Sequence, residues 1–107
     1  MFARSVTVHL KPNSVAAFNG TFEKDILPML QKQKGFQDAI SLVASDGSEA
    51  VGISLWDQKL DADAYYRTTY SDVQKLLAKV SEGTPQVQTY EVGTSTIHKT
   101  AARGAGV

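Results

Sequence analysis

The stretch SVTVHLKP, residues 5–12, decides the fold because it is the clearest β-strand in the chain. Apolar side chains alternate strictly with polar ones along it: Val6, Val8 and Leu10 with Ser5, Thr7 and His9. Such alternation is typical of a strand that buries one face. The polar face carries one of the two histidines of the chain, so what covers that face decides whether the strand contributes to a binding site.

The strand is expected over 3–11, and a helix is expected to follow it. Pro12 ends the strand, and apolar residues then recur at spacings of three and four over 15–30. Because Pro28 lacks a backbone donor, this helix should kink or split near Asp25.

A β-hairpin is expected next, with strands over 36–45 and 49–56 joined by the turn SDGS at 45–48. A second helix is expected over 61–82, and Gly83 should end it. Its apolar stripe consists of Tyr66, Tyr70, Val73, Leu76, Leu77 and Val80.

The last strand is expected over 86–97, which completes the order β-α-β-β-α-β. This order predicts an α+β fold of the ferredoxin-like type, with a four-stranded antiparallel sheet and both helices on one face. We expect a single domain, 1–98, followed by a flexible tail, 99–107. His98, at the end of the last strand, is expected to lie on the surface.

The composition argues against several classes of function. The 107 residues include 11 basic and 11 acidic side chains, so the formal net charge is zero and no partner nucleic acid or acidic membrane is expected. No apolar run is long enough to span a membrane, and the N-terminus lacks the pattern of a signal peptide. The absence of cysteine excludes disulfides and thiolate metal sites and favours the cytoplasm.

The sheet face opposite the helices should also be covered. In strand 49–56, the side chains expected under the helices are Val51, Ile53 and Leu55. The opposite face of the strand then carries Ala50, Gly52, Ser54 and Trp56. The neighbouring strands also carry apolar residues on both faces, and a sheet of that kind is covered on both. A second copy of the chain is the expected cover. The polar face of the first strand would then point into the space between two sheets.

Three segments resemble the antibiotic biosynthesis monooxygenase family of the dimeric α+β barrel superfamily. They are VTVHLKPNSVAAF (6–18), LPMLQKQKGF (27–36) and ISLWDQKLDADAYYRTTY (53–70). The resemblance implies a homodimer whose two sheets pack face to face as a dimeric α+β barrel. Some members of that family oxidise polyketide quinols by O₂ without a cofactor, some degrade haem, and many have no known substrate.

The haem-degrading branch fits this chain poorly. That branch uses an asparagine on the first strand, and a tryptophan and a histidine on the second helix. The helix predicted over 61–82 contains neither of the latter two residues. Two histidines far apart in a chain without cysteine also make no metal signature. We therefore expect no metal and no cofactor.

The candidate site residues come from the face that we place between the two sheets. His9 is the candidate catalytic base, because an imidazole titrates near neutral pH and can take a phenolic proton. Thr7 and Ser54 would orient a substrate, and Trp56 would pack against its ring. Each has a structural alternative: His9 could bond across the sheet or to the partner subunit, and Trp56 could belong to the core.

Two further residues leave the stripe of the second helix. Tyr65 and Arg67 could line the mouth of a cavity, or they could simply be solvated. Tyr66 and Tyr70 are expected in the core.

Two functions remain open at this point. One is a cofactor-independent monooxygenase that acts on a small aromatic or quinol-type compound. The other is a non-catalytic ligand-binding or structural dimer of the same fold. A cavity of a few hundred Å³ with convergent polar groups would favour the first.

Overall fold

The strand that opens the chain lies inside the sheet. The computed structural model describes residues 1–97, and there β1 (Phe2–Leu10) pairs with β3 (Glu49–Trp56) on one side and β4 (Ser81–Glu91) on the other. The strand β2 (Phe36–Val43) completes the sheet beside β3, in the order β2-β3-β1-β4, and every pair is antiparallel. The predicted α+β, ferredoxin-like arrangement is confirmed. The proposed end of the domain at 98, the tail 99–107 and His98 lie outside the described residues.

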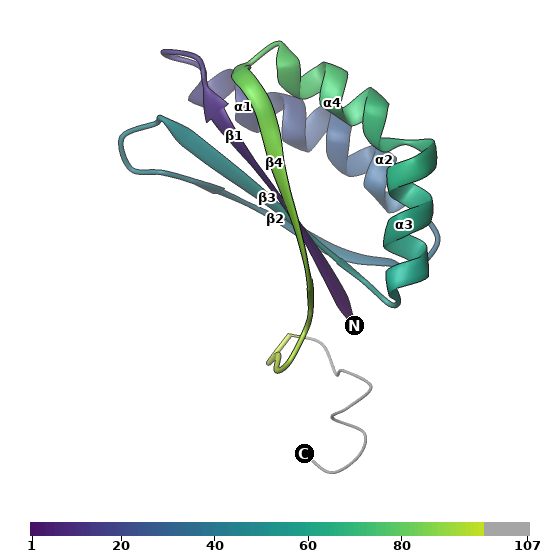
Figure 1. The fold of residues 1–107 in the computed structure, drawn as a ribbon. Helices are drawn as coiled ribbons and strands as arrows, with labels where there is room; N and C mark the ends of the chain where they lie inside the picture. The colour runs from purple at the N-terminus through teal and green to yellow at the C-terminus, as the bar shows by residue number, and fades with distance from the viewer. Residues whose placement is uncertain (98–107) are drawn as a thin grey trace.

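All the helices pack on one face of the twisted sheet (Figure 1). The first helical segment is made of α1 (Val15–Thr21), the π-helical turn η1 (Phe22–Ile26) and α2 (Leu27–Gln31), in direct succession. The turn lies just before Pro28, whose missing donor leaves the carbonyl one turn earlier without its usual partner. The helix that was predicted to kink or split near Asp25 is continuous there, and its winding widens to a π-helical turn.

The second helical segment differs from the single helix predicted over 61–82. It consists of α3 (Lys59–Thr68) and α4 (Tyr70–Ala78), separated by a break at Thr69. The break changes which side chains face the sheet. The Tyr65 side chain is buried, with 3% of its surface exposed, whereas Tyr66 is 57% exposed. The prediction that Tyr66 is core and that Tyr65 leaves the stripe was wrong, because a single period was carried across the break.

The last strand begins and ends earlier than predicted, at Ser81 and Glu91 in place of 86 and 97. Gly83 does not end a helix but lies within β4, with a φ of 71°. Gly83 and Pro85 lie where the register between β1 and β4 shifts, between the pairs of Thr7 and His9. A residue without a side chain and a residue without a backbone donor are both tolerated at such an irregularity.

The predicted faces of β3 are reversed. Val6 pairs with Gly52 and Val8 with Ala50, and directly paired residues point to the same side of a sheet. The set of Ala50, Gly52, Ser54 and Trp56 therefore lies under the helices, where Trp56 is fully buried. The small residues make room for the helices, since a Cβ atom at Gly52 would lie 3.2 Å from the Phe22 ring.

The face without helices carries a band of apolar side chains, which we call the free sheet face: Ile40, Leu42, Val51, Ile53, Leu55 and Tyr90. Ile40, Leu42 and Tyr90 are each about half exposed. The interior lies on the other side, between the sheet and the helices. Its largest fully buried side chains are Trp56 and Phe18. Among the described residues, no helix is long and apolar enough to cross a membrane.

Candidate functional site

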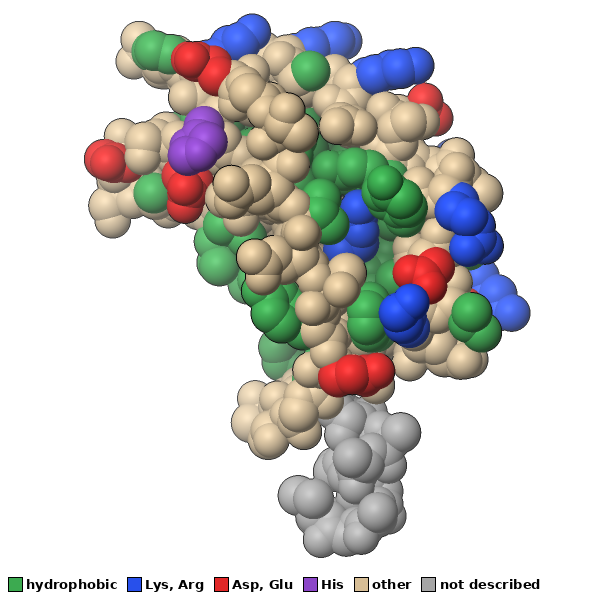
Figure 2. All heavy atoms as spheres, viewed as in Figure 1, with side chains coloured by type: hydrophobic (Ala, Val, Ile, Leu, Met, Phe, Trp, Pro, Cys, Tyr) green, Lys and Arg blue, Asp and Glu red, His purple; other side chains and the backbone are tan. Residues whose placement is uncertain are grey.

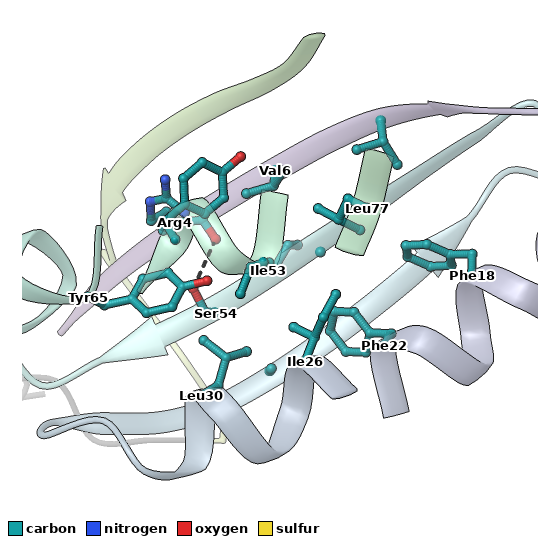
Figure 3. A pocket seen from close by; sticks show the side chains of 15 residues that line it. Arg4, Val6, Phe18, Phe22, Ile26, Leu30, Ile53, Ser54, Tyr65 and Leu77 are labelled. Carbon is teal, nitrogen blue, oxygen red and sulfur yellow. Dashed lines mark hydrogen bonds between the residues drawn. The ribbon is translucent and has the colours of Figure 1, made fainter. Parts of the chain in front are cut away.

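A cavity of about 40 Å³ lies between the sheet and the helices, and we call it the inner cavity. Figure 3 shows apolar side chains from the first helical segment and α4 converging on it, including Phe18, Phe22, Ile26 and Leu77. Arg4, Ser54, Tyr65 and Tyr70 supply its polar lining. A space of this size holds water but not an aromatic molecule.

A larger hollow, which we call the outer groove, opens between β4 and the helices α3 and α4. Its volume is about 390 Å³, and it is lined by Arg4, Ala62, Asp63, Tyr66, Tyr70, Gln74, Pro85, Val87 and Thr89. Figure 2 shows this region as a hollow in which a cationic side chain is recessed among hydrophobic ones. Arg4 and Tyr70 line both spaces, so they form the wall that separates them.

Arg4 is placed by β1, the strand between β3 and β4. It lies opposite Ser54 on one neighbouring strand and Thr89 on the other, and only 3% of its surface is exposed. Its guanidinium carbon lies 4.2 Å from the centre of the Tyr70 ring, 5.3 Å from that of Tyr66 and 5.5 Å from that of Tyr65. Among residues 1–97 the buried Nη2 atom has no hydrogen-bond partner.

The hydroxyl of Tyr70 is the second buried polar group without a hydrogen-bond partner of acceptable geometry in the described chain. Burial raises the pKa of Tyr70, while the nearby positive charge of Arg4 opposes that rise. Burial likewise raises the pKa of Tyr65 to about 12, again with Arg4 acting in the opposite direction. Both phenols therefore stay protonated at neutral pH and can donate a hydrogen bond.

A short chain of hydrogen bonds supports this wall from behind. The Trp56 indole donates to Ser54 Oγ at 2.8 Å, and Ser54 Oγ donates at 3.5 Å to the backbone carbonyl of Arg4. The Trp56 ring lies between Phe36 and Tyr65, at 5.6 Å and 5.2 Å from their ring centres. These contacts hold the segment of β1 that carries Arg4.

The structure brings three of the predicted site residues together and separates the others. Ser54, Trp56 and Tyr65 lie on the face covered by helices. Thr7 and His9 lie on the opposite face of the sheet. The His9 Nδ1 atom is 4.0 Å from Glu49 Oε2 on the paired strand, and the two side chains are 66% and 44% exposed.

The remaining predicted binding residue, Arg67, is exposed on α3 and does not line either space. The six predicted residues therefore do not form one site within the chain, because the sheet separates two of them from three others.

Two residues of the wall, Arg4 and Tyr70, are not among the predicted site residues, and the sequence predicts Tyr70 only as part of the core. A signal for Arg4 exists in the sequence, since it continues the alternation of Val6, Val8 and Leu10 on the buried face. A charge at such a position points into the interior, which is costly without a function or a partner. In the described part of the chain, no group of three or more metal-ligating side chains comes together.

The fold defines a class of protein, the small α+β proteins in which helices pack on one face of a four-stranded antiparallel sheet. Neither a family model nor a curated protein sequence matches the chain. Solved structures do share its fold, and those named below are 14–17% identical to it.

One of these structures is a monooxygenase, ActVA-Orf6 of Streptomyces coelicolor, in complex with nanaomycin D. Its TM-score is 0.76 at 14% identity, with 88% of each chain covered. A second is SnoaB of Streptomyces nogalater, a cofactor-independent oxygenase, with a TM-score of 0.74 at 14% identity, over 91% of this chain and 97% of that one.

A third is a protein of Nitrosomonas europaea assigned to the antibiotic biosynthesis monooxygenases. Its TM-score is 0.71 at 17% identity, and the match covers 88% of this chain and all of that one. The predicted resemblance to this family is thus confirmed at the level of the fold.

Proposed function

We propose that the chain is a cofactor-independent monooxygenase that oxidises a flat hydroxyaromatic or quinol-type compound bound in the outer groove. The observation that carries the proposal is the groove itself, which has the volume of a small-molecule site and has the buried cation Arg4 in its wall. Tyr66 and Tyr70 stack at 5.7 Å and offer aromatic surface to a planar ligand. The similarity in fold to two solved oxygenases supports the proposal.

The proposed reaction needs only substrate and O₂. The hydroxyaromatic compound loses a proton, and its anion gives one electron to O₂. The two radicals join as a hydroperoxide at an activated carbon, and loss of water leaves a carbonyl group. For an activated CH₂, the balance is CH₂ + O₂ → C=O + H₂O, so no external reductant takes part.

His9, the base expected from the sequence, has no role in this scheme, because the sheet lies between its side chain and the groove. The proton instead leaves to water in the open groove, helped by the positive charge of Arg4.

An oxygen electrode tests the proposal directly. We expect the purified protein, treated with a chelator, to speed O₂ consumption by at least one member of a panel of quinols and anthrone-like compounds. The product should gain one oxygen atom from ¹⁸O₂, measured by mass spectrometry. Catalysis that appears only after a metal, a flavin or haem is added would contradict the proposal.

We further propose that the chain works as a homodimer that joins two free sheet faces. Three large side chains on that face, Ile40, Leu42 and Tyr90, are half exposed, and a second copy would remove them from water. The dimeric α+β barrel expected from the sequence is the arrangement that this contact would form.

A second candidate function is ligand binding without chemistry. The groove has one carboxylate, Asp63, and its Oδ2 atom lies 2.9 Å from Lys59 Nζ, so it is a weak candidate for a base. A protein that binds aromatic compounds tightly yet leaves O₂ consumption at the background rate would favour this alternative.

A further inference from the structure

Arg4 is a buried cation whose counter-charge is missing. Two charged side chains line the outer groove, Arg4 and Asp63, and Asp63 is already paired with Lys59. Within residues 1–97 no ion pair of Arg4 is found, and its Nη2 atom has no hydrogen-bond partner. Because a guanidinium keeps its charge at every physiological pH, it cannot avoid this cost by losing a proton.

The three tyrosine rings around Arg4 compensate for only part of that charge. They lie 4.2–5.5 Å from the guanidinium carbon and attract it through their faces. A ring face does not replace an acceptor in the plane of the guanidinium, where its N–H groups point. The unpartnered Nη2 atom is the group that remains unsatisfied.

The Tyr70 hydroxyl is unsatisfied in the same wall. The Tyr70 oxygen is a neutral acceptor that acts on the guanidinium, so what the wall lacks is an acceptor with a negative charge. An acceptor with a full negative charge would satisfy the hydrogen bonds and supply the counter-charge at the same time.

We infer that Arg4 and Tyr70 form a receptor for an aromatic oxyanion, and that the ligand of the outer groove binds with its negative oxygen against these two residues. The apolar and aromatic lining of Ala62, Tyr66, Pro85 and Val87 faces the ring system of the ligand. The inference rests on the proposed function only for the nature of the oxygen, which a phenol or enol substrate would supply as its conjugate base. A carboxylate on a flat ring has the same chemistry at this receptor.

The first experiment compares 2-naphthoate with its neutral isostere 2-naphthamide by isothermal titration calorimetry under argon at pH 7. We expect the full-length protein to bind naphthoate at least about tenfold more tightly, as a charge-assisted hydrogen bond implies. The variant Arg4→Met keeps most of the side-chain length and should lose that preference. The control Lys75→Met removes an exposed positive charge from α4, away from the groove lining, and should keep it.

The second experiment separates a phenolate from a carboxylate as the bound oxyanion. We expect the protein to lower the apparent pKa of 4-nitrophenol by about one unit, seen as phenolate absorbance at a lower pH. Arg4→Met should abolish the shift, and Arg4→Lys should retain only part of it because an ammonium lacks the planar fork of donors. Preference for naphthoate without this shift would assign the site to carboxylates.

Thermal melts of each variant show whether it is folded. If Arg4→Met fails to fold, Tyr70→Phe takes its place, since it removes one donor and keeps the ring. We expect Tyr70→Phe to lower the affinity for naphthoate severalfold and to leave the affinity for naphthamide unchanged. Equal affinities for the two naphthalene compounds together with an unshifted nitrophenol would overturn the inference, as would an Arg4→Met protein that binds naphthoate like the wild type. If the protein prefers the anion but consumes O₂ only at the background rate, the monooxygenase proposal fails and the oxyanion receptor stands.

Discussion

Tyr65 shows how one residue connects the core to the site. Its ring packs against Trp56 at 5.2 Å, and its polar end lies near Arg4 in the lining of the inner cavity. Burial raises its pKa to about 12 from an ordinary value of 10. The protonated phenol is therefore the form that the folded protein favours.

The sign of the resulting pH dependence follows from that shift. Below pH 10 the phenol is protonated in both states, so its full contribution to stability is present. Between pH 10 and 12 the unfolded chain ionises first, and the free energy of unfolding falls. A shift of this size corresponds to about 2–3 kcal/mol at its upper limit.

We expect Tyr65→Phe to flatten this alkaline loss of stability. Urea unfolding at pH 8 and at pH 11 should show a smaller difference for the variant than for the wild type. Phenolate absorbance should also lose one late-titrating tyrosine. Identical pH profiles for the two proteins would show that Tyr65 is not the group responsible.

At the scale of the elements, two glycines with positive φ make different demands on their surroundings. Gly35, between α2 and β2, has a φ of 79°, and a Cβ atom there would lie 2.0 Å from the Asp61 carboxylate and 2.7 Å from Asp61 Cβ. Gly83, within β4, has a φ of 71°, and a Cβ atom there would meet no atom within 4 Å. A comparison of substitutions at Gly35 and Gly83 therefore separates the cost of backbone strain from the cost of steric overlap.

We expect Gly83→Ala to lower the free energy of unfolding by about 1–2 kcal/mol, the cost of a left-handed alanine. Gly35→Ala should cost about 1–3 kcal/mol more, because Asp61 must also move. Chemical denaturation of both variants measures the difference, and the double variant Gly35→Ala, Asp61→Ala should recover only part of it, because the Cβ atom of residue 61 remains within 2.7 Å of the new Cβ atom. Equal losses of stability for the two variants would mean that the start of α3, which carries Asp61, shifts at little energetic cost.

At the scale of the whole molecule, the free sheet face is the surface through which the proposed dimer would form. The proposed dimer buries Ile40 and Leu42, so a charge at either position would have to be desolvated in the contact. Leu60 is also a large, exposed apolar residue, but it lies on α3, away from this face. It therefore provides a matched control.

We expect a dimer of twice the 11.6 kDa chain mass in sedimentation equilibrium at micromolar concentration. Ile40→Asp should weaken association by at least about tenfold, and Leu60→Asp should leave it unchanged. A wild-type protein that sediments as a monomer would remove the barrel from the proposal. The outer groove, which lies on the other face, would remain.

The sequence by itself determined those features that depend on a few neighbouring residues. The faces of β1 follow from its alternation, the wider turn before Pro28 follows from a missing donor, and the turn at 45–48 follows from its own chemistry. The Ser48 backbone and hydroxyl both donate to Asp46 Oδ1, and Gly47 takes a φ of 75°. Such features are local, so the element order and the fold class could be predicted correctly.

Only the tertiary structure decided which residues form the candidate site. The two faces of β3 are both apolar, and the choice between them depends on its register with β1 and on the space that the Phe22 ring requires. The break at Thr69 moved Tyr65 into the core and Tyr66 out of it. Arg4 became a site residue because α3 and α4 bring three rings around it, and contacts between residues so distant in sequence leave no periodic pattern in the chain.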